Sequence, residues 1–211
     1  MAIFVDRAAA GRELAAVLEP YRGVAARVFG IPRGGVVVAA EVARHLGMPL
    51  RAVVVRKLGA PGHEEFAVGA IAEGVRVISD EALRRDRIPP DELAEVEQRE
   101  RRELARRGGL FASQVEPLDG LTAIVVDDGI ATGATAEAAC RALRARGAAT
   151  IVLAVPIAPA RWEPAPDVVD TYVCPHRMPE FWAVGAFYAD FTQTEDAEVA
   201  ALLDGDLGVD R

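Results

Sequence analysis

The chain has 211 residues, of which 51% are hydrophobic and 27% charged, with a formal net charge of −8. This apolar content supports a buried core and excludes a disordered chain, while charges, Gly and Pro interrupt every apolar run before it could span a membrane. The acidic balance excludes a general affinity for nucleic acid, and the first residues lack the basic and apolar regions of a secretory signal, which predicts a cytoplasmic protein.

Helical and strand-like segments alternate along the chain. The hydrophobic pattern predicts helices over residues 7–19, 34–47 and 134–146. It predicts strands over residues 25–31, 50–55, 121–126, 150–155 and 168–173. These strands are continuous apolar runs, which is typical of strands buried on both faces. We therefore expect an α/β fold, a doubly wound and mostly parallel sheet flanked by helices, in a single domain over residues 1–211.

A charged segment at about residues 79–113 falls outside this alternation. Pro89-Pro90 divides it, and residues 91–107 have Glu and Arg four apart, in the order that favours a helix, with only a thin apolar stripe. Gly108-Gly109 is expected to end this helix. We interpret the segment as a solvated helical insertion; a partner-binding arm or an active-site cover are the alternatives.

The stretch at residues 124–135, IVVDDGIATGAT, carries the most chemistry. An apolar strand brings Asp127 and Asp128 to its carboxyl end, where open parallel sheets bind ligands. A small-residue turn with two hydroxyl groups then opens a helix, and its backbone N–H groups suit a phosphate monoester. Carboxylates beside a phosphate make sense if they accept hydrogen bonds from a sugar diol, so the pattern predicts a ribose 5-phosphate site. The alternative is that the aspartates only cap a buried strand end.

This stretch resembles the signature of type I phosphoribosyltransferases, two acidic residues and a T-G-x-T loop after an apolar strand. The resemblance implies that Asp127 and Asp128 hold the ribose hydroxyls of phosphoribosyl pyrophosphate (PRPP). It also implies that the 5-phosphate is bound by Ala131, Thr132, Gly133, Ala134 and Thr135. A receiver domain also has paired aspartates after a strand, but near the start of its chain and without T-G-x-T.

A second loop, IPRGG at residues 31–35, also joins a strand to a helix. In the family that the chain resembles, the equivalent loop binds the pyrophosphate and often contains a cis peptide. Arg33 has a planar fork of donors that suits a diphosphate, and Gly34 and Gly35 tolerate unusual dihedral angles. Arg33 is accordingly expected to act with the acidic pair in catalysis.

Arg56 and Lys57 are expected to close the next strand, where they would neutralise charge on the departing pyrophosphate. The alternative is a solvated strand end. The Gly- and Ala-rich residues 59–74 predict a long loop or a loose hairpin, and they occupy the place of the mobile loop that closes over the ligand in the resembling family.

The acceptor is less defined. Five of the 12 aromatic residues lie within residues 181–191, where they could stack on a base or plug the edge of the sheet. Trp182 begins a segment similar to the one that stacks on the base in 6-oxopurine enzymes, and Asp190 lies one place from the acidic residue that follows it there. Against this, Ala131 stands where those enzymes carry an aspartate. The base stays undecided.

The resemblance implies a type I phosphoribosyltransferase-like fold with a C-terminal hood-like segment. It implies an enzyme that transfers 5-phosphoribosyl from PRPP to a small nitrogen acceptor such as a nucleobase, with Mg²⁺ held mainly through ligand oxygens and pyrophosphate released. No residue is assigned as a direct metal ligand or as a general base. A homo-oligomer is also expected. The rival is a non-catalytic regulator that binds PRPP; PRPP synthesis would require an ATP site, for which the sequence has no candidate residues.

Overall fold

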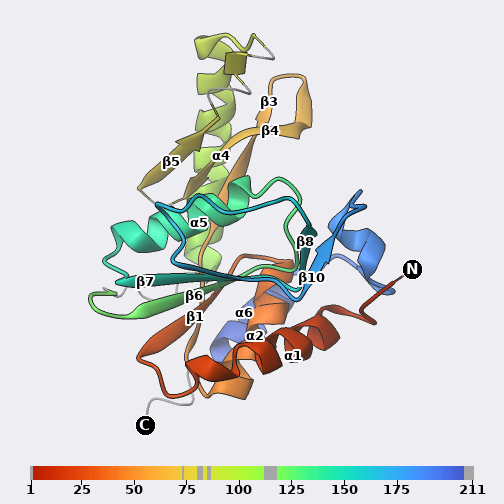
Figure 1. The fold of residues 1–211 in the computed structure, drawn as a ribbon. Helices are drawn as coiled ribbons and strands as arrows, with labels where there is room; N and C mark the ends of the chain where they lie inside the picture. The colour runs from red at the N-terminus through yellow and green to blue at the C-terminus, as the bar shows by residue number, and fades with distance from the viewer. Residues whose placement is uncertain (1, 73, 80–82, 85–86, 112–117, 207–211) are drawn as a thin grey trace.

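The computed structural model describes residues 2–72, 74–79, 83–84, 87–111 and 118–206 (Figure 1). Its centre is a five-stranded parallel sheet with strand order β2-β1-β6-β7-β9. These strands are β2 (Leu50–Ala52), β1 (Ala26–Gly30), β6 (Thr122–Val126), β7 (Thr150–Ala154) and β9 (Thr171–Val173). The predicted α/β fold with a mostly parallel sheet is confirmed.

Helices cover both faces of this sheet. On one face lies α5 (Ala134–Ala145); on the other lie α1 (Arg7–Val17), α2 (Gly34–Leu46) and α6 (Asp196–Asp206), as Figure 1 shows. Strand β6 contributes to both cores, because Ala123 and Val125 pack in the cluster around α5 while Ile124 and Val126 pack with α2. This explains the unbroken apolar run: successive side chains of a strand point to opposite faces, and here both faces are buried.

A smaller antiparallel sheet stands above α5. It consists of β3 (Val55–Ala60), β4 (His63–Ala72) and β5 (Val75–Ile78), in that order, and packs against the long helix α4 (Pro90–Phe111). The predicted strand at residues 50–55 is therefore two strands, and Arg56 and Lys57 lie on β3 rather than at the end of a core strand. Of the two alternatives for residues 59–74, the hairpin is the one observed, between β3 and β4.

Helix α4 does not end at Gly108-Gly109 as predicted, but continues to Phe111. Each glycine costs a helix roughly 1 kcal/mol relative to alanine. Phe111, however, is buried among residues of the cluster around α2, and burying such a side chain contributes about 1.5–3 kcal/mol. Packing at the end of the helix therefore offsets the two weak positions. The other predicted insertion residues at 80–82, 85–86 and 112–113 lie outside the described residues.

Ion pairs join α4 to the antiparallel sheet. Glu97 accepts from Arg101 one helical turn later, as the four-residue spacing predicts, and also from Arg76 on β5. Glu100 accepts from Arg56 on β3, with donor–acceptor distances of 2.6 and 2.9 Å. The polar face of α4 is thus bound to the sheet by charge as well as by its apolar stripe.

The residues before α1 run beside a segment from the C-terminal part of the chain, at residues 187–190. β8 (Ile157–Pro159) pairs with β10 (His176–Met178), and the chain then forms the short 3₁₀ helix η2 (Val184–Phe187). A second 3₁₀ helix, η1 (Glu19–Tyr21), follows α1. Beyond η2 the backbone N–H groups of Ala189 and Asp190 donate to the carbonyls of Phe4 and Val5. Among the described residues, none of the helices has the length and apolar character needed to cross a bilayer.

Candidate functional site

The acidic pair lies at the carboxyl end of β6, where both side chains are half-buried. The carboxylate of Asp127 accepts from the backbone N–H of Asp128 at 2.9 Å. The Oδ2 atom of Asp128 accepts from Nε of Arg7 at 2.7 Å, and these two side chains are only 16% and 12% exposed. Asp128 is therefore one half of a nearly buried ion pair.

Arg7 is the site residue that the sequence did not predict. Its Nη1 atom donates to the carbonyl of Thr192 at 2.8 Å, and its guanidinium lies 3.8 Å from the centre of the Phe191 ring. The hydroxyl of Tyr188 donates to the backbone carbonyl of Asp128 at 2.6 Å. Helix α1 and the segment at residues 188–192 thus meet at Asp128. The only sequence signal would have been that a carboxylate at a buried strand end needs a cation as partner.

The loop at residues 31–35 lies directly beside the acidic pair. It follows β1, contains a cis peptide between Pro32 and Arg33, and leads into α2 at Gly34. A Cβ atom at position 35 would lie 2.8 Å from both Oδ1 of Asp127 and the carbonyl oxygen of Val126. At position 34 it would overlap Oδ2 of Asp128 and lie 2.6 Å from Nε of Arg7. Both glycines are required by this close approach, not by their backbone dihedrals.

The loop after the acidic pair ends at Gly133, which is the N-cap of α5 with φ of +83°. Having no side chain, Gly133 provides no capping hydrogen bond, so the first N–H groups of α5 are left for another acceptor. Ala131 and Thr132 are exposed, and Ala134 and Thr135 are half-exposed at the start of the helix. Such a terminus, with free N–H groups and the positive end of the helix dipole, suits an anion.

Comparison with known proteins agrees with this geometry. The family model described as "Phosphoribosyl transferase domain" matches residues 7–192, most of the chain. The chain belongs to the phosphoribosyl transferase family. The predicted family is thereby confirmed.

Two relatives extend the comparison. The crystal structure of TT1426 from Thermus thermophilus is 40% identical, with a TM-score of 0.72 over 96% of this chain and 98% of that one. A Mycobacterium tuberculosis protein named "Putative phosphoribosyl transferase" is 49% identical over 97% of this chain. The alignment covers 47% of that protein, so the present phosphoribosyl transferase chain spans about half the length of the curated relatives it matches.

The acidic pair of this phosphoribosyl transferase domain is easier to protonate than two exposed aspartates. Burial, together with the negative charge of Asp128, raises the pKa of Asp127 well above its usual range. Burial also raises the pKa of Asp128, and the Arg7 guanidinium opposes this rise. Asp127 is thus the member of the pair whose charge is less compensated.

The predicted pyrophosphate residues occupy different surroundings. Nη1 of Arg33 lies 3.7 Å from Oδ1 of Asp196 on α6, and the amide of Gln193 contacts the same guanidinium. Arg56 is bound to Glu100, as described above. Lys57 is exposed on β3. The Arg33 guanidinium is therefore held near the start of α6, while the next two residues of its loop, Gly34 and Gly35, pack on the acidic pair. Arg56 is held between the antiparallel sheet and α4.

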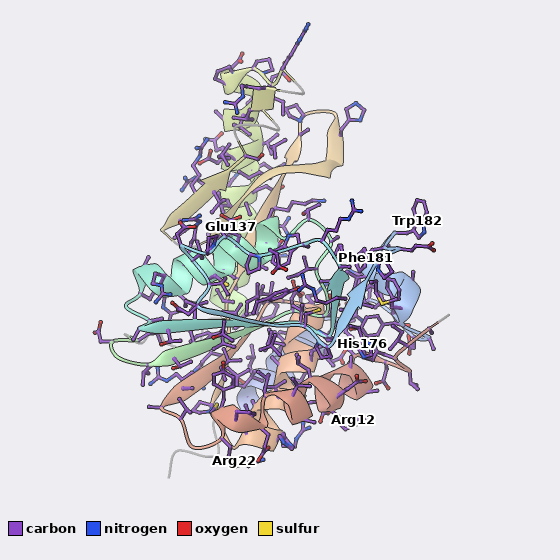
Figure 2. The ribbon with its side chains drawn as sticks, in the orientation of Figure 1. Arg12, Arg22, Glu137, His176, Phe181 and Trp182 are labelled. Atoms are coloured by element: carbon purple, nitrogen blue, oxygen red, sulfur yellow. The ribbon has the colours of Figure 1, made fainter. Side chains whose placement is uncertain are left out.

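The aromatic segment divides into a buried and an exposed part. Phe187 and Tyr188 are buried in a cluster with Phe4, and Phe181 packs on Phe187 with ring centres 5.2 Å apart. Trp182 is 92% exposed and projects from the surface (Figure 2). Phe187 and Tyr188 are therefore core residues, whereas Trp182 is the most exposed aromatic side chain of the segment.

Asp190 is exposed and accepts from the N–H of Thr192 at 2.9 Å and from its hydroxyl at 2.5 Å. These hydrogen bonds lower the pKa of Asp190, because they favour the charged form. Asp190 is thus a carboxylate at the point where its backbone N–H donates to the carbonyl of Val5.

Within the described residues, no three His, Cys, Asp or Glu side chains come together as a metal site. The half-buried carboxylate of Asp127 is a hard oxygen donor at the open end of the sheet. This donor set fits Mg²⁺, which is commonly held by one or two carboxylates and by the phosphates of its substrate.

Proposed function

We propose that this domain transfers the 5-phosphoribosyl group of PRPP to a small nitrogen acceptor, a nucleobase being the leading class, and releases pyrophosphate. The observation that carries the proposal is the convergence of three features at one edge of the sheet. The uncapped start of α5 and the acidic pair both follow β6, and the loop at residues 31–35 packs against that pair through Gly34 and Gly35.

In this proposal each loop binds one part of the donor. The N–H groups and hydroxyls of residues 131–135 bind the 5-phosphate, and Asp127 and Asp128 accept hydrogen bonds from the ribose hydroxyls. Arg7 keeps Asp128 in its acceptor form, since a neighbouring cation favours the carboxylate. The ribose is thereby fixed while positive charge develops at its anomeric carbon.

The transfer step forms one bond and breaks one. The lone pair of the acceptor nitrogen forms a bond to the anomeric carbon, and the carbon–oxygen bond to pyrophosphate breaks with both electrons leaving on the pyrophosphate. A proton on the acceptor nitrogen passes to solvent, because no side chain is assigned as its base. Arg33 stabilises the charge that develops on the leaving group. Bound Mg²⁺ would add charge neutralisation on the same diphosphate.

Arg56 and Lys57 are proposed as further cations for the pyrophosphate. Arg56 would have to exchange Glu100 for the diphosphate, which requires this ion pair to separate and β3 to move toward the ligand. Such a movement would also bring residues 59–72 toward the site, as expected of a closing loop. Trp182 and Asp190 are proposed to contact the acceptor.

The test is release of pyrophosphate from PRPP with Mg²⁺ across a panel of nucleobases. We expect release with at least one base, and its loss when Asp127 is replaced by Ala. Gly109→Ala in α4 is the matched control, since no atom lies within 4 Å of a Cβ there. Stabilisation by PRPP in a melting assay, without release for any base, would overturn transfer and identify a regulator that binds PRPP.

A further inference from the structure

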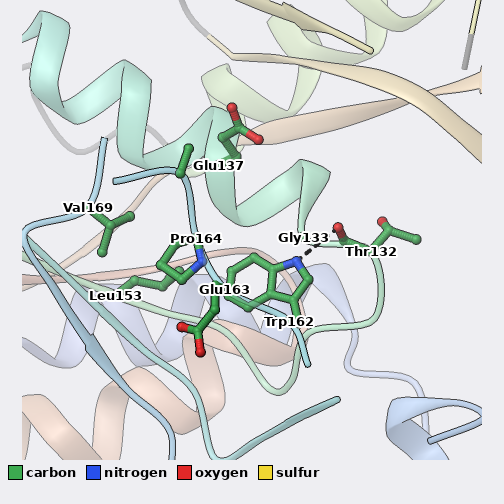
Figure 3. A pocket seen from close by; sticks show the side chains of 9 residues that line it. Thr132, Gly133, Glu137, Leu153, Trp162, Glu163, Pro164 and Val169 are labelled. Carbon is green, nitrogen blue, oxygen red and sulfur yellow. Dashed lines mark hydrogen bonds between the residues drawn. The ribbon is translucent and has the colours of Figure 1, made fainter. Parts of the chain in front are cut away.

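A small pocket lies beside the start of α5 (Figure 3). Trp162, from the turn after β8, forms one wall, and Thr132 and Gly133 of the predicted phosphate loop form another. Nothing in the sequence connects Trp162 with this loop, which lies 30 residues earlier.

The indole contacts the loop in two ways. Nε1 of Trp162 donates to the carbonyl of Thr132 at 3.2 Å, the interaction drawn as a dashed line in Figure 3. The ring also lies against the α-carbon of Gly133, where a Cβ atom would be 2.5 Å from Nε1 and Cε2. Gly133 therefore serves both a left-handed φ of +83° and this close approach.

Trp162 is itself held from three strands. Its backbone N–H donates to the carbonyl of Pro159 in β8, and its ring meets the Tyr172 ring of β9 edge-on, with centres 5.3 Å apart. Arg177 of β10 donates to the carbonyl of Trp162 at 2.9 Å and pairs with Glu163. The indole is thus a fixed support rather than a surface side chain that happens to touch the loop.

The direction of the hydrogen bond has a consequence for the phosphate site. In a trans peptide unit the C=O and the following N–H point in opposite directions. Fixing the Thr132 carbonyl toward the indole therefore aims the N–H of Gly133 to the other side of the loop. Gly133 gives α5 no side-chain cap, so the first N–H groups of the helix can join that of Gly133 in binding an anion placed away from the indole.

We propose that Trp162 is a positioning residue, which orients the peptide between Thr132 and Gly133 so that its N–H binds the 5-phosphate. The inference rests on the proposed function, because it assumes a phosphorylated sugar at residues 131–135. It adds a residue that touches the loop and not the ligand.

The test uses the fact that the chain has two tryptophans. In a Trp182→Phe parent, Trp162 is the sole fluorophore of this kind, and we expect ribose 5-phosphate to shift or quench its emission. Trp162→Phe in that parent keeps a ring but removes the donor. Loss of one hydrogen bond that organises an anion site should raise the Kd for ribose 5-phosphate about three- to tenfold, measured by calorimetry.

Inorganic pyrophosphate with Mg²⁺ is the internal control, because its proposed site is the loop at residues 31–35. We expect Trp162→Phe to leave the Kd for pyrophosphate unchanged. Equal weakening of both ligands would indicate a general structural defect and overturn the inference, as would an unchanged Kd for ribose 5-phosphate. Failure of the parent to bind ribose 5-phosphate would overturn this inference and the phosphate site together, whereas binding without turnover would overturn catalysis alone.

Discussion

Gly34→Ala is the sharpest test of how the two loops are joined. The new methyl group would overlap Oδ2 of Asp128 and lie 2.6 Å from Nε of Arg7, so the ion pair must separate or α2 must shift. Gly34 has no left-handed φ, and the expected effect is therefore steric and electrostatic rather than a matter of backbone conformation.

The size of the effect follows from the burial of the pair. Forcing an extra methyl group into a packed site costs about 1–3 kcal/mol. Separating the ion pair adds to this cost, because its side chains are only 12% and 16% exposed. The added cost is smaller than the roughly 3–5 kcal/mol for removing one partner of a buried pair, since both partners remain and can still interact. We expect a loss of roughly 2–4 kcal/mol, which corresponds to about 5–15 °C in Tm for a domain of this size.

Calorimetric unfolding of four proteins tests the cause: the parent, Gly34→Ala, Arg7→Ala and the double variant. Without Arg7 the Asp128 carboxylate can turn away from the methyl group, so Gly34→Ala should cost at least about 1 kcal/mol less in the Arg7→Ala background. Gly109→Ala, in a helix and with open space around its Cβ, should be neutral or stabilise by about 0.5–1 kcal/mol. Additive costs of the two changes, or a Gly34→Ala variant as stable as the parent, would refute the reasoning.

Three further variants test separate contacts. Asp127→Asn should stabilise the fold, and its advantage in Tm over the parent should grow from about pH 4 to pH 7. The pKa of Asp127 is raised above 3.8 in the folded protein, so the folded state binds this proton more tightly and the parent loses stability as pH rises. Asn does not titrate, so the variant does not have this loss. An advantage that shrinks with pH would contradict this. Tyr188→Phe should cost about 1 kcal/mol in urea unfolding, through loss of its hydrogen bond to the Asp128 carbonyl; an equal loss in Tyr21→Phe, which lacks this bond, would point elsewhere. Phe111→Ala should lower the free energy of unfolding by about 3–5 kcal/mol and increase amide hydrogen exchange in the last turn of α4. Faster exchange without a loss of stability would mean that the packing of Phe111 does not extend the helix.

The core of the fold was predictable because its signals are local. The unbroken apolar run of β6 reflects burial on both faces, and the residues that follow it carry the acidic pair and the turn into α5 in one continuous stretch. The neighbouring residues alone therefore place the acidic pair and the turn into α5 at the carboxyl end of this strand.

The contacts that tune the site were not predictable in this way. Arg7 and Asp128 are 121 residues apart, and Trp162 reaches Thr132 across 30 residues, so neither pairing has a spacing that could be read. The extension of α4 to Phe111 has the same cause, since the two glycines are visible in the sequence but the cluster that receives the phenylalanine is not. At the end of α4 a tertiary contact outweighs a local propensity, and at Asp128 and Thr132 it adds a partner that no local pattern indicates.

The arrangement around Asp128 also addresses a conflict within the proposed function. A ribose diol needs acceptor oxygens, whereas the phosphates on either side of it disfavour negative charge. Pairing Asp128 with Arg7 keeps the acceptor while compensating its charge, and the raised pKa of Asp127 lowers the penalty of placing a second carboxyl beside the first. Gly34 and Gly35 let the loop at residues 31–35 approach this compensated pair closely. A chain with a net charge of −8 can therefore offer an anionic donor a site whose local charge differs from that of the protein as a whole.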